Sequence, residues 1–375
     1  MKKKKGVKPS YTPVFLTLKA YERIVGYAIR YANNSMNPGN WREVYGILIG
    51  TVENNERVIV KDAIPIMAGD RAGVAFENKQ YVDTAQIDAS IYERSIQDMK
   101  NDFIIGWWHT HPNMGFFYSV VDRTTQLGYQ IPNPYAVGLI FDHCKRESEE
   151  NYLGIAGLRL KDPDFGMRSP FTLVEVNFEY DKETMMKKTN KVIKTVSKNM
   201  NRVLKEINYI DNVLRKKNLA QLQRNYGLIL VPKEDIKITD NEQEAEEDER
   251  FLYEWDPNIY KKTYRIPKFR EKIEKAVSEA YDELDKLPKG GESEDYEIRR
   301  KKLTKKIHTI LKKPNDWYEK LIEEFSKRIE IISPFFTYLD TDERKVIEYF
   351  EERSSEYCRI LDNLNIRAEL NLENI

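Results

Sequence analysis

The sequence predicts an α/β (α+β) domain, a mixed sheet with flanking helices, followed by an all-α helical region. Up to about residue 180, short runs of β-branched and aromatic residues alternate with amphipathic stretches, which is typical of a sheet covered by helices. Beyond it, apolar residues recur at steps of three and four, as they do on packed helices. We expect a domain at 1–180, a heptad-bearing helix and connector at 181–239, an acidic linker at 240–250 and a helical domain at 251–375.

The elements of the first domain are predicted in order from apolar periodicity and turn residues. Asn54 and Asn55 mark a hairpin turn between the second and third strands, and the stretch 66–76 has no periodicity and is expected to be irregular. Ser119 is expected to open a helix. The expected strands are 14–18, 44–50, 58–64, 102–108, 136–141, 153–160 and 171–178, and the other expected helices are 20–31 and 80–99.

Composition excludes several classes of protein. The chain has 375 residues, enough for two or three domains, and its 61 basic and 61 acidic residues give no net attraction to nucleic acid or acidic membranes. No apolar run is long enough for a transmembrane helix. Lys2 to Lys5 lack the apolar segment of a signal peptide, so we interpret them as a solvated tail. Cys144 and Cys358 show no metal spacing, which favours a reducing, cytoplasmic compartment.

The second half of the chain predicts helices and carries no chemical motif. A heptad seam begins the region and indicates a helix that packs against another helix, either in a separate chain as a coiled coil or within this chain. Further amphipathic patterns follow the acidic run, and Asp340 with Glu343 is expected to cap the last helix. The seam consists of Ile193, Val196, Met200, Val203, Ile207, Ile210 and Leu214.

The residues that carry chemistry lie in the middle of the first domain. His109 and His111 follow the predicted strand 102–108, and side chains two apart on a strand point to the same face, so the two imidazoles converge. Asp122 falls in the first turn of the helix that Ser119 opens, from where its carboxylate can supply a third metal ligand. Two imidazoles and one carboxylate leave zinc a fourth position open to water, which is typical of a catalytic site.

Each part of this pattern has a simpler interpretation when taken alone. Ser119 and Asp122 fit a helix N-cap with an acidic residue in the first turn, and a His-x-His pair can end a strand without binding anything. Together, in this order and spacing, they favour the metal site. His143 and His308 have no comparable neighbours in the sequence and are expected to be ordinary surface or edge residues.

The run His109-Thr110-His111-Pro112, followed by Ser119 and Asp122, resembles the motif of the JAMM (MPN-plus) metallopeptidases, the family of the proteasome-lid deubiquitinase. That motif also requires an upstream glutamate, and Glu43 stands where the family has it, ahead of an apolar strand. The resemblance covers roughly the first half of the chain. It implies an MPN-type fold for 1–180, with one Zn²⁺ held by both histidines and Asp122.

The resemblance also implies an activity. Glu43 would act as the general base that takes a proton from zinc-bound water and passes it to the leaving amine. The Ser119 hydroxyl would donate a hydrogen bond to the developing oxyanion. The bond cleaved would be an isopeptide between the C-terminus of ubiquitin or a ubiquitin-like protein and a lysine side chain.

Four residues are expected to contact the substrate. In the family, the stretch corresponding to 67–74 lies beside the active site and holds an extended substrate tail, which suggests Met67 and Val74; Trp108 and Phe116 are added from the motif. An ordinary connecting loop is the alternative for 67–74.

Other functions remain open at this point. The chain departs from many family members at Asn113 and at Phe117-Tyr118, which leaves its substrate preference undetermined. The main alternative is a non-catalytic MPN scaffold subunit of a multiprotein complex, although such members usually lack a site residue and none is missing here. A third is a JAMM hydrolase acting on a small molecule or a DNA-repair partner. Expected partners are ubiquitin or ubiquitin-like conjugates and an MPN-like or helical chain bound through the heptad helix, without nucleic acid or membrane.

Overall fold

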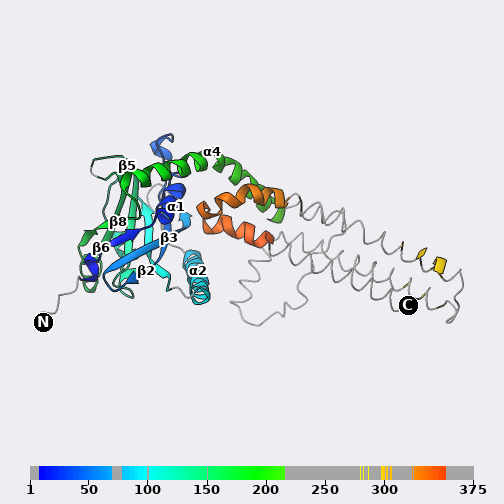
Figure 1. Cartoon of the computed structure of the whole chain (residues 1–375), viewed down its shortest axis with the longest axis horizontal. Helices are drawn as coiled ribbons and strands as arrows, with labels where there is room; N and C mark the ends of the chain where they lie inside the picture. The colour runs from blue at the N-terminus through cyan, green and yellow to red at the C-terminus, as the bar shows by residue number, and fades with distance from the viewer. Residues whose placement is uncertain are drawn as a thin grey trace. The chain divides into compact units, whose positions relative to one another are not determined.

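The computed structural model describes residues 8–69, 78–98, 101–149, 151–215 and 325–351, with isolated positions between 279 and 323 (Figure 1). The chain divides into two compact units: Met1–Leu204 with Ser333–Lys345, and Lys205–Ile332 with Val346–Ile375. The acidic run 240–250 and most of the helical patterns expected beyond residue 251 lie outside the described residues.

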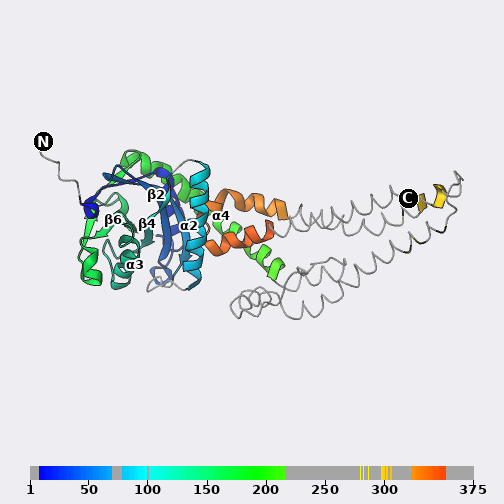
Figure 2. The ribbon, with the colours of Figure 1, turned by 90° about the horizontal axis from the view of Figure 1, so that it is seen from below.

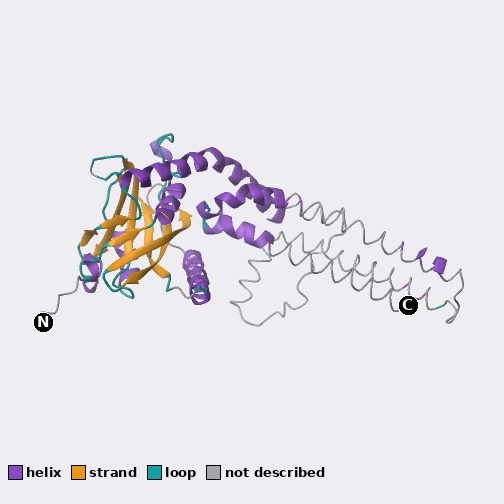
Figure 3. Ribbon diagram, in the orientation of Figure 1, coloured by secondary structure: helices purple, strands orange, loops and turns teal. Residues whose placement is uncertain are grey.

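The first unit is built on one mixed sheet, as the sequence predicts (Figure 3). Its order is β7-β6-β5-β4-β2-β3-β1-β8, in which β4 pairs with β5, and β1 with both β3 and β8, in parallel, while the other pairs are antiparallel. The strands are β1 (Val14–Leu16), β2 (Val44–Glu53), β3 (Arg57–Ala68), β4 (Phe103–Thr110), β5 (Val137–Arg146), β6 (Leu153–Leu160), β7 (Phe171–Val174) and β8 (Val176–Phe178).

The hairpin between β2 and β3 is confirmed at the expected asparagines. Asn54 and Asn55 both have positive φ angles, of 51° and 57°, which asparagine tolerates better than most residues. The expected irregular stretch 66–76 is wrong at its start, because β3 continues to Ala68 and Ile66 is buried in the core. Its burial against the sheet outweighs the weak periodicity of its neighbours; residues 70–77 lie outside the described residues.

The expected single strand 171–178 is two strands on opposite edges of the sheet. β7 pairs with β6, whereas β8 pairs with β1, and Glu175 alone separates them. Consecutive Cα atoms are only about 3.8 Å apart, so the sheet must curl until its two edges meet at Glu175, whose carbonyl accepts a hydrogen bond from the Val14 N–H. Periodicity along one run cannot show which neighbour each half will pair with.

Helices cover both faces of this curled sheet (Figure 2). On one face, α1 packs through Tyr27 edge-on against Trp108, and an added Cβ at its Gly26 would lie 3.3 Å from Val192 of α4. On the other face, Ile91 of α2 joins a core cluster with Trp107, beside which Leu127 of α3 packs. The helices are α1 (Leu18–Ala28), α2 (Asn78–Gln97), α3 (Val120–Gln130) and α4 (Lys182–Arg215).

A segment from near the end of the chain, Ser333–Lys345, belongs to the first unit. Arg30, in the turn that follows α1, makes a two-pronged ion pair with Glu343, with nitrogen–oxygen distances of 3.0 and 2.5 Å, and the Thr341 hydroxyl donates to the Ile66 carbonyl. The expected cap is confirmed: the Asp340 N–H donates to the Glu343 carboxylate and the Glu343 N–H to the Asp340 carboxylate. The domain boundary at residue 180 stays a prediction, and this returning segment was not part of it.

The heptad seam of α4 is largely buried within this chain. Val196, Met200, Val203, Ile207 and Ile210 are all less than a tenth exposed, which fits the alternative in which the helix packs intramolecularly. In the second unit, Arg328 lies 3.5 Å from the Tyr209 ring and pairs with Glu206, and Phe325 stacks on Phe350. A coiled coil with a separate chain stays a prediction.

Among the described residues, no helix is both long and apolar enough to cross a membrane.

Candidate metal centre

The two histidines of the motif converge as the strand geometry predicts. His109 is the penultimate residue of β4. The His111 N–H still donates to the Phe141 carbonyl of β5 at 2.9 Å, so pairing continues one residue beyond the strand. Both side chains therefore point to one face of the sheet. Their Nε2 atoms lie 2.8 Å apart, and both imidazoles are about 3% exposed.

Asp122 completes the group from the first turn of α3. Its Oδ1 lies 3.4 Å from Nε2 of His109, and its Oδ2 lies 3.6 Å from Nε2 of His111. The same residue also forms the helix cap, because its Oδ2 accepts from the Ser119 N–H at 2.7 Å while its own N–H donates to the Ser119 hydroxyl. The cap and the ligand group are thus not alternatives, since the cap holds the carboxylate in front of the histidines.

The protonation of the group suits a cation. Complete burial lowers the pKa of His109 to about 3, so this imidazole is neutral near pH 7. Burial also disfavours the charged form of His111, but hydrogen bonding and attraction to Asp122 outweigh it and raise the pKa of His111. Burial likewise opposes ionisation of Asp122, yet its histidine neighbours and the Ser119 N–H hold its pKa well below the usual range. A buried carboxylate facing two imidazoles is a negatively charged set of nitrogen and oxygen donors.

The donor set fits Zn²⁺ by its chemistry and convergence. One ligand atom from each of His109, His111 and Asp122 lies within 4.8 Å of the others, and imidazole nitrogens with a carboxylate oxygen are among the preferred ligands of zinc. His111 Nδ1 lies 3.0 Å from the Gly115 carbonyl, which can only accept, so this nitrogen carries the proton. In the neutral imidazole the Nε2 lone pair is then left to face the other two donors.

Glu43 lies at the entrance of β2, half-buried, next to this group. Its backbone carbonyl accepts from the Gly69 N–H at 2.8 Å, which anchors the residue beside the end of β3. Burial raises the pKa of Glu43 to about 7, with His111 lowering it and Asp122 raising it. A carboxyl with a pKa near neutrality can both accept and release a proton under ordinary conditions.

Ser119 has a hydroxyl proton to give. Its Oγ accepts from the Asp122 N–H at 3.2 Å as part of the cap, which uses a lone pair and leaves the O–H as a donor. The hydroxyl is half-buried beside the Asp122 carboxylate.

A buried polar network that the sequence analysis missed ties α3 to β4 beneath the histidines. Trp107 Nε1–H donates to Gln126 Oε1 at 2.8 Å, and the Trp107 ring stacks on His109 at 4.7 Å. Gln126 is fully buried, and its Nε2 donates to Gln130 and to the Ala136 carbonyl. Gln126 follows Asp122 by one helical turn, so the signal available was a polar residue on the face that the helix turns toward the sheet.

Of the expected substrate contacts, Met67 and Phe116 lie on the same side of the sheet as the histidines, whereas Trp108 does not. Met67 is half-buried and pairs with Tyr45, which pairs with His109 across β2, so all three lie on one face of the sheet. Phe116 is half-buried against the same core cluster. Trp108 is fully buried and packs on Tyr27 at the opposite face, because alternate residues of a strand point to opposite faces; it cannot contact a substrate at the metal centre without unpacking the core.

Val74 and Phe117 are the other two residues near the motif whose positions bear on substrate contact. Val74 lies outside the described residues. Phe117, which was not among the expected contacts, is 38% exposed and its ring lies 4.8 Å from that of His111. The sequence pattern alone did not indicate that the Phe117 ring would lie beside His111.

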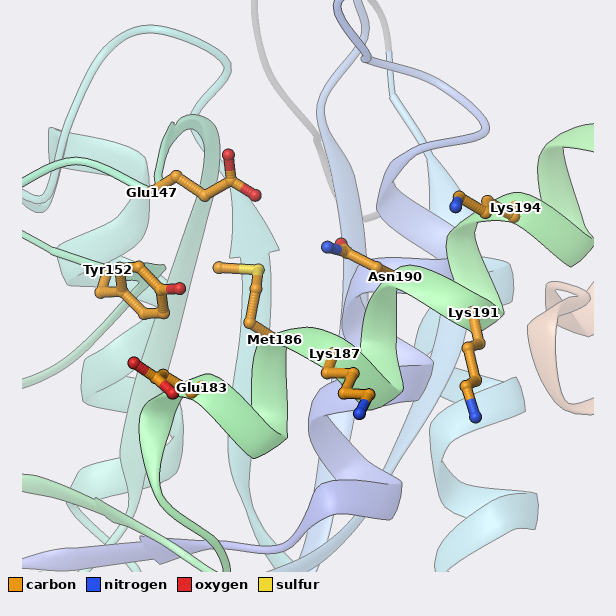
Figure 4. A pocket seen from close by; sticks show the side chains of 8 residues that line it. All are labelled: Glu147, Tyr152, Glu183, Met186, Lys187, Asn190, Lys191 and Lys194. Carbon is orange, nitrogen blue, oxygen red and sulfur yellow. The ribbon is translucent and has the colours of Figure 1, made fainter.

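A surface cavity of about 570 Å³ lies elsewhere, between α4 and the end of β5 (Figure 4). None of its lining residues belongs to the metal centre. They are Glu147, Tyr152, Glu183, Met186, Lys187, Asn190, Lys191 and Lys194.

A mixed sheet between helices, with two histidines and an aspartate converging at the end of a central strand, defines an MPN-type domain. Residues 10–135 match the family model described as JAB1/Mov34/MPN/PAD-1 ubiquitin protease. Residues 10–135 thus carry a JAMM/MPN-type domain, and the expected family resemblance and fold class are confirmed for this part of the chain.

Individual relatives match only part of the chain. It is similar to COP9 signalosome complex subunit 5 of Saccharomyces cerevisiae, 27% identical over 185 residues, which cover 46% of this chain and 39% of that protein. AMSH-like protease sst2 of Schizosaccharomyces pombe is 33% identical over 124 residues, covering 32% of this chain and 24% of that protein. The 26S proteasome regulatory subunit rpn11 of Schizosaccharomyces pombe is 27% identical over 130 residues, covering 33% of this chain and 38% of that protein. The chain thus spans well under half the length of these relatives.

Proposed function

We propose that the MPN domain is a zinc-dependent isopeptidase, which hydrolyses the bond between a ubiquitin or ubiquitin-like C-terminus and a lysine amine. The observation that carries the proposal is the convergence of His109, His111 and Asp122 beside a half-buried glutamate whose pKa lies near 7. The family description as a ubiquitin protease and the names of relatives such as AMSH-like protease support the substrate class.

The residues that would hold the ion are His109, His111 and Asp122. Zn²⁺ bound there would supply Lewis acidity, which makes water a stronger acid and polarises a substrate carbonyl. The chain contributes a buried, preorganised donor set, since the imidazoles are held by the β4–β5 pairing and the carboxylate by the α3 cap.

Glu43 is assigned as the general base. Its carboxylate takes the proton of the attacking water and then gives it to the lysine amine as that amine leaves, so one side chain serves both steps. Its pKa near 7 is suited to this, because the carboxylate is a strong enough base to accept and the acid a strong enough acid to donate.

Ser119 and the sheet face that carries His109 are assigned to substrate binding. The O–H of Ser119, beside the Asp122 carboxylate, is assigned to donate to the oxyanion that forms on the scissile carbonyl. Met67 lies two strands away from His109 on the same face, a distance of about 10 Å at the usual strand spacing. An extended C-terminal tail passing Met67 and Phe116 would bring its last residue to the metal centre.

Cleavage of a ubiquitin dimer or a ubiquitin-like fusion by the zinc-loaded full chain tests this function. Glu43→Gln is expected to retain zinc and to lose at least about 100-fold in rate, because it removes the base without removing a ligand. Glu53→Gln is the matched control, since Glu53 lies at the far end of β2, which follows Glu43, and its side chain pairs with Arg57. Full cleavage by Glu43→Gln would exclude the assigned base. A zinc-bound chain inactive on every ubiquitin-like conjugate would favour the non-catalytic scaffold.

A further inference from the structure

The carboxylate of Asp142, in β5, is fully buried and accepts three backbone hydrogen bonds. Its Oδ1 accepts from the Asn113 and Cys144 N–H groups, both at 2.9 Å, and its Oδ2 accepts from the Gly115 N–H at 3.0 Å. Two of these donors belong to the loop 112–115, which directly follows His111. Such donors compensate a buried carboxylate for its lost hydration, and in return the carboxylate fixes the loop.

This loop has a conformation that requires support. Asn113 has a φ of 60° and Gly115 a φ of 83°, both in the left-handed region that residues other than glycine and asparagine rarely adopt. The only other backbone bond within the loop joins the Met114 N–H to the His111 carbonyl, at 3.1 Å, among the described contacts. The loop is therefore held mainly by the side chain of Asp142.

The fixed loop acts directly on a metal-site histidine. The Gly115 carbonyl accepts from His111 Nδ1 at 3.0 Å, and it is the adjacent N–H of the same residue that Asp142 holds. A carbonyl can only accept, so its position determines both the rotation of the His111 ring and which nitrogen carries the proton. Asp142, Gly115 and His111 thus form a chain of contacts that ends at the Nε2 atom facing Asp122.

We propose that Asp142 is a positioning residue of the metal centre, which orients His111 through the loop 112–115 without touching metal or substrate. The zinc-affinity part of this inference rests on the proposed function. Groups that orient a ligating histidine typically change metal affinity by about 10- to 100-fold when they are replaced.

A competing interpretation is that Asp142, His143 and Cys144 themselves form a second metal site, since their ligand atoms lie within 4.8 Å of one another. Asp142 already uses its oxygens for three N–H donors. Burial raises the pKa of the Cys144 thiol, which disfavours the thiolate that metals bind. His143 packs edge-on against Trp41 at 4.6 Å. These contacts favour the positioning role.

The experiment uses the full chain with ¹⁵N-labelled histidine, of which there are four. In wild type, with or without zinc, the His111 Nδ1–H is expected to give a proton signal protected from exchange with water. Asp142→Asn places an amide NH₂ against a backbone N–H, and we expect loss of that signal and a zinc dissociation constant about 10- to 100-fold higher in competition with a chelator. Cys144→Ala keeps the backbone N–H that Asp142 accepts, so both readings should match wild type.

Gly115→Ala gives an independent test if Asp142→Asn does not fold. An added Cβ there meets no atom within 4 Å, so the substitution strains only the loop backbone, and it should weaken zinc binding several-fold. Wild-type zinc affinity together with a protected His111 signal in either folded variant would overturn the proposal. Two zinc ions per chain, one of them lost in Cys144→Ala, would also overturn it. A wild type that binds no zinc would refute the proposed function, while the metal-free His111 signal would still decide the role of Asp142.

Discussion

At the scale of single residues, Ser119 serves structure and chemistry with one side chain, and Glu43 shows how burial prepares a carboxyl for chemistry. Glu43 directly precedes β2, and its burial there raises the pKa of its carboxyl group. Ser119 caps α3 with the oxygen of the hydroxyl whose proton is assigned to the substrate. The two roles of Ser119 can be separated by experiment, because the cap uses a lone pair of the hydroxyl oxygen and the assigned catalytic role uses the hydroxyl proton.

The acid limb of the activity profile is expected to belong to Glu43. The base must be deprotonated, so kcat/KM should rise with pH as the carboxyl ionises, and one pH unit below its pKa the rate should be about tenfold lower. In the metal-free chain that pKa is about 7. A neighbouring cation favours the carboxylate and therefore moves the limb to lower pH. The profile is measured between pH 5 and 8 for wild type and for the residual activity of Glu43→Gln. An unchanged acid limb in that variant would assign it to another group.

Ser119 can be tested by comparing two small replacements. Ser119→Ala loses the cap and the donor, so it should lower stability by about 1 kcal/mol and the rate by about 100- to 1,000-fold. Ser119→Gly costs the helix only a few tenths of a kcal/mol while losing the same donor. Thermal unfolding and kcat are therefore expected to separate in the glycine variant. If the rate of each variant followed its stability instead, Ser119 would act only as a cap.

At the scale of elements, α1 holds a segment that is distant in sequence. The Arg30 guanidinium, only 4% exposed, lies between the rings of Tyr27 and Tyr31 and pairs with Glu343 and with the Tyr338 carbonyl. Gly26 of the same helix leaves room for the Tyr338 ring, since an added Cβ would lie 2.7 Å from it. The fit of α1 and the turn after it to Ser333–Lys345 thus depends on the Arg30 guanidinium and on the absence of a side chain at Gly26.

Arg30→Ala is expected to release this segment. Removing the cation leaves Glu343 largely buried without its partner, which typically costs about 3 kcal/mol or more. Hydrogen exchange should show lower protection of the amides in 333–345. Arg57→Ala breaks the exposed pair with Glu53, which is worth at most about 1 kcal/mol, and should leave that protection unchanged. Equal protection in both variants would mean that the ion pair does not hold the segment.

At the scale of the whole chain, α4 carries the apolar seam that the sequence left open to packing within this chain or with a second chain. Its apolar seam is buried from Val196 to Ile210, while its exposed positions carry a row of basic side chains spaced three and four apart. This distribution matches a helix whose packing needs are met within its own chain. The basic row consists of Lys187, Lys191, Lys194, Lys198 and Arg202.

Light scattering distinguishes the two alternatives for the seam. If the seam packs within the chain, the mass should correspond to one chain across a range of concentrations. A concentration-dependent dimer that is lost in Met200→Asp, with the fold of the MPN domain retained, would instead support pairing with a second chain. Lys198→Asp, on the exposed side of the same helix, is the matched control.

The sequence by itself determined the fold class, the convergence of His109, His111 and Asp122 and the cap of α3, because each follows from local periodicity or from residues close together in the chain. Strand alternation places His109 and His111 on one face whatever surrounds them, and Ser119 with Asp122 forms its cap locally. The tertiary structure alone decided the split of 171–178 between two sheet edges, the burial of Trp108 on the opposite face, the return of 333–345 to α1 and the contact of Asp142 with the loop after His111. These features join residues far apart in sequence, and neither periodicity nor spacing records which distant partner a strand, a ring or a carboxylate will meet.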